Sequence, residues 1–95
     1  MKLWLITQDV NNDYDTYDSA VVVAATEEEA RRISPDGFRV WNDGAWHFQF
    51  ADGSMKRESR HDSWADPDQV KAVCIGEAAD GLTAGQKICA SFNAG

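Results

Sequence analysis

Only one segment of the sequence carries the signals of an α-helix, and that segment is short. Residues 26–29, Thr-Glu-Glu-Glu, are a capping box, in which the hydroxyl of Thr26 caps the amide of Glu29 and the Glu29 side chain reaches back. Acidic residues at its start and two arginines at 31 and 32 suit the helix dipole, and Pro35 ends it. Because about two turns of helix are marginal alone, strands must supply most of the fold.

Two strand patterns come before this helix. Residues 2–8 place apolar side chains on both faces, which is typical of a central strand, and we expect Trp4 in the core. Residues 19–25, SAVVVAA, are a continuous run that predicts a second buried strand. The polar segment 9–18, rich in Asp and Asn, is the loop between them.

The middle of the chain predicts an aromatic meander. Residues 38–41 and 45–51 form a hairpin around the turn at 42–44, and its aromatic side chains alternate with polar ones. A second turn, Asp52-Gly53, is expected to be of type I′. The following residues, 55–60, are either a third, polar strand or a loop.

Two more strands are predicted near the end of the sequence, at 69–76 and 87–92. If these strands pair with each other around the loop that joins them, Cys74 faces Cys89. The first residues lack the apolar run and cleavage site of a signal peptide. We therefore expect a cytoplasmic protein whose thiols stay reduced.

These elements predict a single α+β domain over residues 1–95, with the order β-β-α-β-meander-β-β. One mostly antiparallel sheet carries the short helix on one face. No apolar run approaches the roughly 20 residues that cross a bilayer, so no membrane contact is expected.

The net charge of the chain limits the classes of partner that it is expected to bind. It has 16 acidic and 9 basic residues, so its net charge is −7. Such a chain repels phosphate backbones, which makes nucleic acid an unfavoured partner. Solubility, a basic protein partner and mimicry of nucleic acid stay open as reasons for the acidity. A domain of this size buries only about 60–65% of its unfolded surface, so a homodimer would easily supplement its stability.

No catalytic residue or cofactor is predicted. A nucleophile needs a neighbouring base, and nothing in the sequence places His47 or His61 beside Cys74 or Cys89. Two histidines and two distant cysteines also lack the spacing of a zinc site.

The acidic segment 9–15 has oxygen ligands at alternate positions, like the start of a calcium loop. However, Tyr14 stands where the turn needs Gly, and Ala20 stands where the bidentate Glu belongs. We therefore interpret the segment as a solvated loop and predict no metal site.

Both ends of the chain carry a family resemblance. Residues 2–33, KLWLITQDVNNDYDTYDSAVVVAATEEEARRI, together with IGEAADG at 75–81 and ICASFNAG at 88–95, resemble a family of small uncharacterised phage and prophage proteins. The aromatic segment at 38–63 differs from the shorter linkers of that family, so the resemblance implies that the aromatic hairpin at 38–60 is an insertion within the single domain. The resemblance implies a phage-derived gene and action inside the infected bacterium, and it transfers no catalytic or binding residue.

The leading hypothesis is a non-enzymatic, phage-type accessory protein that binds a host or phage protein in the host cytoplasm. Its sharpest form is an acidic, anti-CRISPR-like inhibitor of a bacterial defence system. Exposed tryptophan is enriched at binding hot spots, and four tryptophans are hard to bury in so small a domain. Packing of the aromatic hairpin on the helix-free sheet face stays open as the alternative. The expected partner-binding residues are Asp9, Asp13, Asp15, Asp18, Trp41, Trp46, Phe48 and Trp64.

Three other functions stay open. One is a nucleic-acid-binding module that uses the aromatic residues with Lys56, Arg57 and Arg60. The second is a structural or assembly component of a virion. The third is an enzyme or small-ligand binder, which would need a pocket uniting a histidine with a cysteine.

Overall fold

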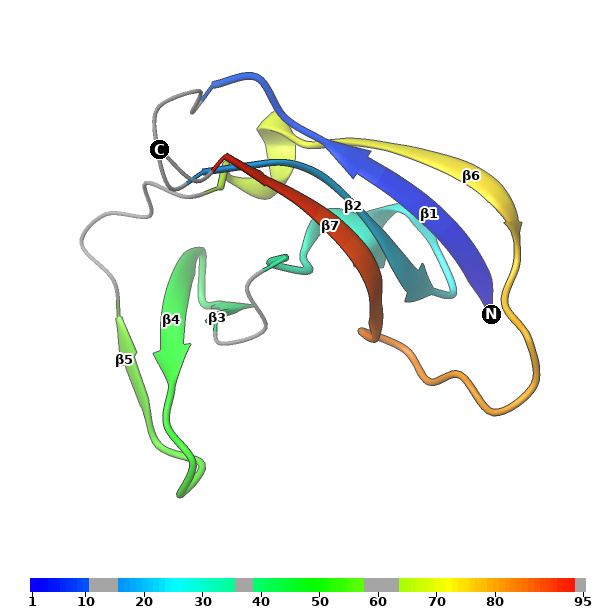
Figure 1. Ribbon diagram of the computed structural model, residues 1–95. Coiled ribbons are helices and arrows are strands. Elements are labelled where there is room, and N and C mark those ends of the chain that lie inside the picture. The colour runs from blue at the N-terminus through cyan, green and yellow to red at the C-terminus, as the bar shows by residue number, and fades with distance from the viewer. Residues whose placement is uncertain (11–15, 36–38, 58–63, 94–95) are drawn as a thin grey trace.

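The computed structural model of the chain describes residues 1–10, 16–35, 39–57 and 64–93. The elements follow the predicted order and confirm the α+β class, with a short 3-10 turn, η1, as an addition before β6 (Figure 1). Their bounds are β1 Lys2–Thr7, β2 Thr16–Ala24, α1 Glu27–Arg31, β3 Arg39–Asn42, β4 Ala45–Gln49, β5 Met55–Arg57, η1 Pro67–Gln69, β6 Lys71–Glu77 and β7 Lys87–Asn93.

The strands divide between two sheets, where one sheet was expected. The larger sheet has the order β6-β1-β2-β7, and the smaller has the order β3-β4-β5. All pairs are antiparallel, and β1 is a central strand as predicted. In the larger sheet, Leu5 lies opposite Val21 on one side and Val73 on the other.

The last two strands do not pair with each other, so the condition under which Cys74 would face Cys89 is not met. β6 pairs with β1 and β7 pairs with β2, so they form opposite edges of the sheet, with Cys74 opposite Trp4 and Cys89 opposite Val21. The connection crosses the end of the β1–β2 hairpin (Figure 1). The physical reason is that the β1–β2 hairpin is apolar and has two open edges. Each of these edges offers unpaired backbone N–H and C=O groups with which one late strand can pair.

Two turns shape the smaller sheet. Asp43 and Gly44 have φ values of 51° and 74°, which is the pattern of a two-residue type I′ turn. At the next turn only Gly53 has positive φ, while the Phe50 amide donates to the Ser54 carbonyl at 2.9 Å. This is a three-residue loop with a glycine bulge. The predicted type I′ turn at Asp52-Gly53 is therefore wrong, because it needs two residues with positive φ.

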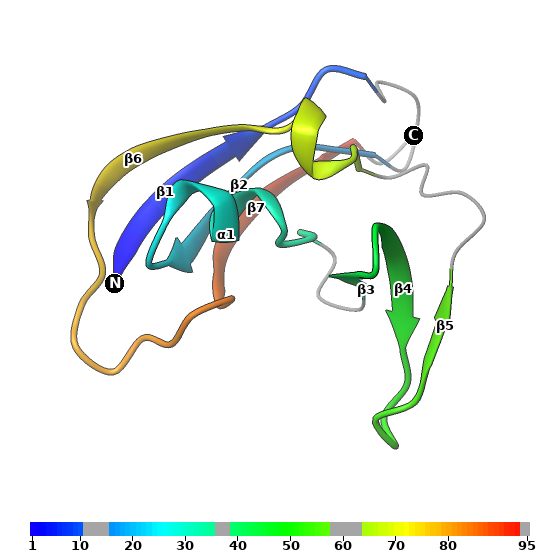
Figure 2. The ribbon, with the colours of Figure 1, turned by 180° about the vertical axis from the view of Figure 1, so that it is seen from behind.

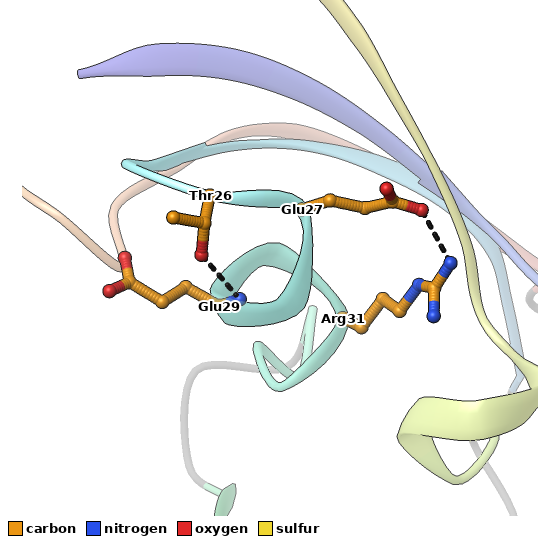
Figure 3. Close-up of polar contacts among 4 residues, drawn as sticks. All are labelled: Thr26, Glu27, Glu29 and Arg31. Atoms are coloured by element: carbon orange, nitrogen blue, oxygen red, sulfur yellow. Dashed lines mark hydrogen bonds and ion pairs between the residues drawn. The ribbon is translucent and has the colours of Figure 1, made fainter.

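The capping box is confirmed. The Glu29 amide donates to Thr26 Oγ1 at 3.2 Å (Figure 3), and the Glu29 carboxylate accepts from the Ala25 amide at 3.2 Å. Arg31 pairs with Glu27 one turn earlier on the helix. The side chains of Arg31 and Glu27 are 39% and 50% exposed, so solvent screens the pair and it adds little stability. The cap and the burial of Ala30 hold this short helix in place.

The core lies on the face of the larger sheet that α1 covers (Figure 2). Trp4 is buried there as expected, and its Nε1 donates to the Ala24 carbonyl at 3.0 Å. On the opposite face of the sheet, Leu3, Leu5 and Val21 are half-buried, whereas Val23 is fully buried. The buried members of the core cluster are Trp4, Ile6, Ala20, Val22, Ala24, Ala30, Trp46, Trp64, Ala65, Val70 and Ala72.

Candidate functional site

Two of the predicted partner anchors are core residues. Trp46 is 3% exposed and Trp64 is 0% exposed, so neither side chain can reach a partner of the folded protein. Both belong to the cluster that contains Trp4 and Ala30. The alternative expectation, packing on the helix-free sheet face, is wrong as well. The reason is that the smaller sheet packs against the face of the larger sheet that the helix also covers. There Trp46 is part of the core cluster, and Trp41 packs against that cluster.

The face of the smaller sheet that carries Trp46 continues past the core, where its side chains are no longer buried in the core cluster. Strand register sets Arg39, Phe48 and Lys56 directly opposite one another across β3, β4 and β5. Directly opposite side chains of an antiparallel sheet share a face. Because side chains alternate along a strand, Phe48 and Trp46 lie on the same face. We call this surface the aromatic–basic face and define it as Arg39, Trp41, Phe48, Phe50 and Lys56.

Ring contacts hold the aromatic–basic face together. Phe48 and Phe50 meet edge to face with centroids 5.0 Å apart and planes at 61°. The Arg39 guanidinium carbon lies 5.9 Å from the centre of the Phe48 ring, within range of a cation–π interaction. Trp41 meets Trp46 in a second edge-to-face pair at 5.2 Å. Exposure therefore increases along the face, from the end next to the buried Trp46 to Phe50, which is 45% exposed.

The predicted basic cluster is split between two faces. Lys56 lies opposite Phe48, whereas Arg57 lies opposite His47 on the other side of the smaller sheet. Both basic residues are exposed. Arg60, the third member of the predicted cluster, lies outside the described residues. A single phosphate-binding patch of the predicted kind is therefore not supported by Lys56 and Arg57.

The predicted acidic patch is described only at its ends. Asp9 is exposed and Asp18 is half-buried, while Asp13 and Asp15 lie outside the described residues. At the base of the loop, the buried side chain of Gln8 links Val10 to Tyr17. Its Nε2 donates to the Tyr17 carbonyl at 2.7 Å, and its Oε1 accepts from the Val10 amide at 2.9 Å. Because Asp13 and Asp15 are not among the described residues, the acidic patch stays a prediction.

A shallow pocket of about 350 Å³ lies between α1 and η1. Its lining contains acidic and basic side chains and one aromatic residue, Trp41. Trp41, one of the predicted partner-binding residues, is therefore half-buried beside the helix. In this pocket Arg32 is paired with Glu28 at 3.2 Å. The pocket is lined by Glu28, Arg31, Arg32, Trp41, Asp66, Pro67 and Asp68.

The described residues bring no catalytic or metal-binding group together. Across the described part of the chain, no group of three or more His, Cys, Asp or Glu residues could hold a metal ion. His47 lies in β4 of the smaller sheet, where its Nδ1 is 3.1 Å from the Ala45 carbonyl oxygen, and Cys74 lies in β6 of the larger sheet. His61 and the side chain of Cys89 lie outside the described residues.

Several exposed apolar residues were missed by the sequence reasoning. Met55 lies at the far end of the smaller sheet, and Val73, Ile75 and Ile88 lie on the two edge strands of the larger one. Val73, Ile75 and Ile88 belong to segments whose pattern predicts a strand, and Met55 belongs to the segment for which strand and loop are both open. The signal that distinguishes an exposed edge from a buried centre is pairing order, which is not written in the local pattern.

No family model matches the chain, and no curated protein or solved structure is significantly similar to it. Among the described residues, no helix has the length and apolar character needed to cross a membrane.

Proposed function

We propose that this chain is a non-enzymatic domain that binds another protein through the aromatic–basic face. The observation that carries the proposal is the exposed ring of Phe50 on a sheet that is held to the core at its other end by Trp46. Aromatic rings that are fixed before binding lose little conformational freedom on association, so they make effective anchors.

The form of the smaller sheet supports this role. It projects from the larger sheet, and its outer end is clear of the helix and the larger sheet (Figures 1 and 2). The contact of Phe48 with Phe50 fixes both rings. A partner that covers these rings gains binding free energy, because burial of apolar surface contributes about 25 cal/mol per Å². Arg39 and Lys56 beside them supply the polar rim that interfaces usually have.

The biological setting is part of the same proposal. The resemblance of both chain ends to phage proteins supports action inside a bacterial host, in its cytoplasm. The net charge of −7 supports the finer form, an inhibitor that occupies a nucleic-acid site of a defence complex. In that form Asp9 and Asp18, at the two ends of the acidic loop, contribute the charge that imitates phosphate.

Affinity capture from host lysate, followed by quantitative mass spectrometry, tests the proposal. Three baits are compared: the unmodified chain, Phe50→Ser and Ile88→Ser. Phe50 and Ile88 are 45% and 46% exposed and lie on different sheets, so they form a matched pair. We expect a partner that is captured by the unmodified chain and by Ile88→Ser and is lost with Phe50→Ser. Capture that depends on Ile88 instead, or no captured partner, would contradict the proposal.

A further inference from the structure

The charge of the smaller sheet is opposite to that of the whole chain. Strands β3, β4 and β5 contain Arg39, Lys56 and Arg57 and no Asp or Glu, so they carry +3 within a chain of net charge −7. Arg39 and Lys56 lie on the aromatic–basic face, which therefore carries +2, and Arg57 lies on the opposite face. Asp43 and Asp52 lie in the turns. Asp52 is engaged within its own turn, because its carboxylate accepts from the Ser54 hydroxyl at 2.6 Å and from the Ser54 amide at 2.9 Å.

From this charge and from the exposed rings we infer that the partner segment bound by the aromatic–basic face is an acidic peptide segment that also carries a large apolar side chain. The inference rests on the proposed function and names its partner. In the bound state a carboxylate pairs with Lys56, which is exposed, and the apolar side chain covers Phe50. Opposite charge then sets the orientation of the segment and speeds its encounter with the face.

The ring geometry favours a peptide over a single-stranded nucleic acid. Base stacking needs an open ring face. The Phe48 ring has Arg39 over it and Phe50 against it, which leaves Phe50 as the one exposed ring of the pair. The net charge of −7 also opposes a long polyanion more than a peptide with a few carboxylates. An acidic peptide therefore matches the face in charge and in the number of rings available.

A displayed library of random peptides, selected on the intact chain, tests the inference. The expected enriched sequences combine Asp or Glu with Leu, Phe or Trp. The affinities of synthetic copies are then measured by fluorescence anisotropy against Lys56→Glu and Arg57→Glu. These variants change the net charge equally, in adjacent exposed residues on opposite faces. We expect Lys56→Glu to weaken binding about tenfold, and Arg57→Glu to weaken it much less.

The outcomes separate this inference from the proposed function. Enriched peptides that are neutral or basic, and that need Phe50, would overturn the acidic partner while leaving the protein-binding role in place. Equal effects of the two charge reversals, or no enriched peptide, would overturn it as well. A labelled oligothymidine that binds more tightly than the selected peptides, and is lost with Lys56→Glu, would assign the face to nucleic acid. Failure of the proposed function itself would appear in the lysate capture.

Discussion

The indole Nε1 of Trp46 donates a hydrogen bond of 3.3 Å to the carbonyl oxygen of Ala65. Trp46 comes from the smaller sheet, and Ala65 comes from the segment that leads into η1 and β6. Both residues are buried, so the bond ties the projecting sheet to the core in a place from which water is excluded. The aromatic–basic face keeps its position because of this attachment.

Replacing Trp46 by Phe should destabilise the protein. The change removes the donor to Ala65 and leaves a buried carbonyl oxygen without this bond, which costs about 1–3 kcal/mol. Chemical denaturation, followed by far-ultraviolet circular dichroism, measures the loss. Trp41→Phe is the control, because Trp41 is only half-buried and contributes at the rim of the core. Equal losses of unfolding free energy in the two variants would show that the hydrogen bond from Trp46 to Ala65 does not stabilise the fold.

The helix cap should be measurable in the stability of the whole domain. Thr26→Ala removes the acceptor for the Glu29 amide, and the loss of such a cap costs about 0.5–2 kcal/mol. Thr83→Ala is a suitable control, because Thr83 is an exposed loop residue whose backbone makes the bonds to Gln86. The free energies of unfolding of both variants are compared in urea. A Thr26→Ala variant as stable as Thr83→Ala would show that the helix does not depend on its cap.

The proposed anchor should be separable from the fold. Phe50 is 45% exposed and lies outside the core cluster, so Phe50→Ser removes mainly the edge-to-face contact with Phe48 and should lower the free energy of unfolding by about 0.5–1.5 kcal/mol, which leaves the protein folded. The same variant should lose partner binding. Thermal unfolding monitored by tryptophan fluorescence makes the comparison. A large loss of stability would mean that Phe50 supports the sheet, and its effect on binding would then have a structural cause.

The turn at Asp52 has a pH dependence of defined sign. Hydrogen bonds from the Ser54 side chain and then from its amide lower the pKa of Asp52 below its ordinary value of 3.8. A depressed pKa stabilises the fold above the ordinary value, and this contribution is lost as pH falls through the lower, folded-state pKa. Carboxyl NMR titration should therefore find Asp52 below 3.8, and Ser54→Ala should raise its pKa toward that value. An unchanged pKa in Ser54→Ala would contradict the assigned cause.

The two cysteines should not form an intramolecular disulfide in the folded protein. Cys74 and Cys89 lie on opposite edge strands, three strand spacings apart. At about 4.8 Å per spacing, the separation far exceeds the roughly 7 Å that a disulfide allows between Cα atoms. Mild oxidation followed by mass spectrometry should find no such link, while Cys74, which is exposed, should react with a thiol reagent in the native state. An intramolecular link formed without unfolding would contradict the order of strands.

The amino-acid sequence by itself determined the features that depend on neighbours along the chain. The capping box at Thr26, the buried strand around Trp4 and the hairpin turn at Asp43 are each set by a few consecutive residues, because caps, strand alternation and positive φ are local properties. The class and order of elements follow from such signals.

The tertiary structure alone decided which residues meet. Trp46 and Phe48 stand two positions apart in one alternating pattern, yet one is core and the other belongs to the proposed interface. The separation of β6 from β7 and the division into two sheets have the same origin. Such outcomes depend on competition among distant segments for the same apolar surface, and a local pattern carries the tendency to be buried without naming the segment that does the burying.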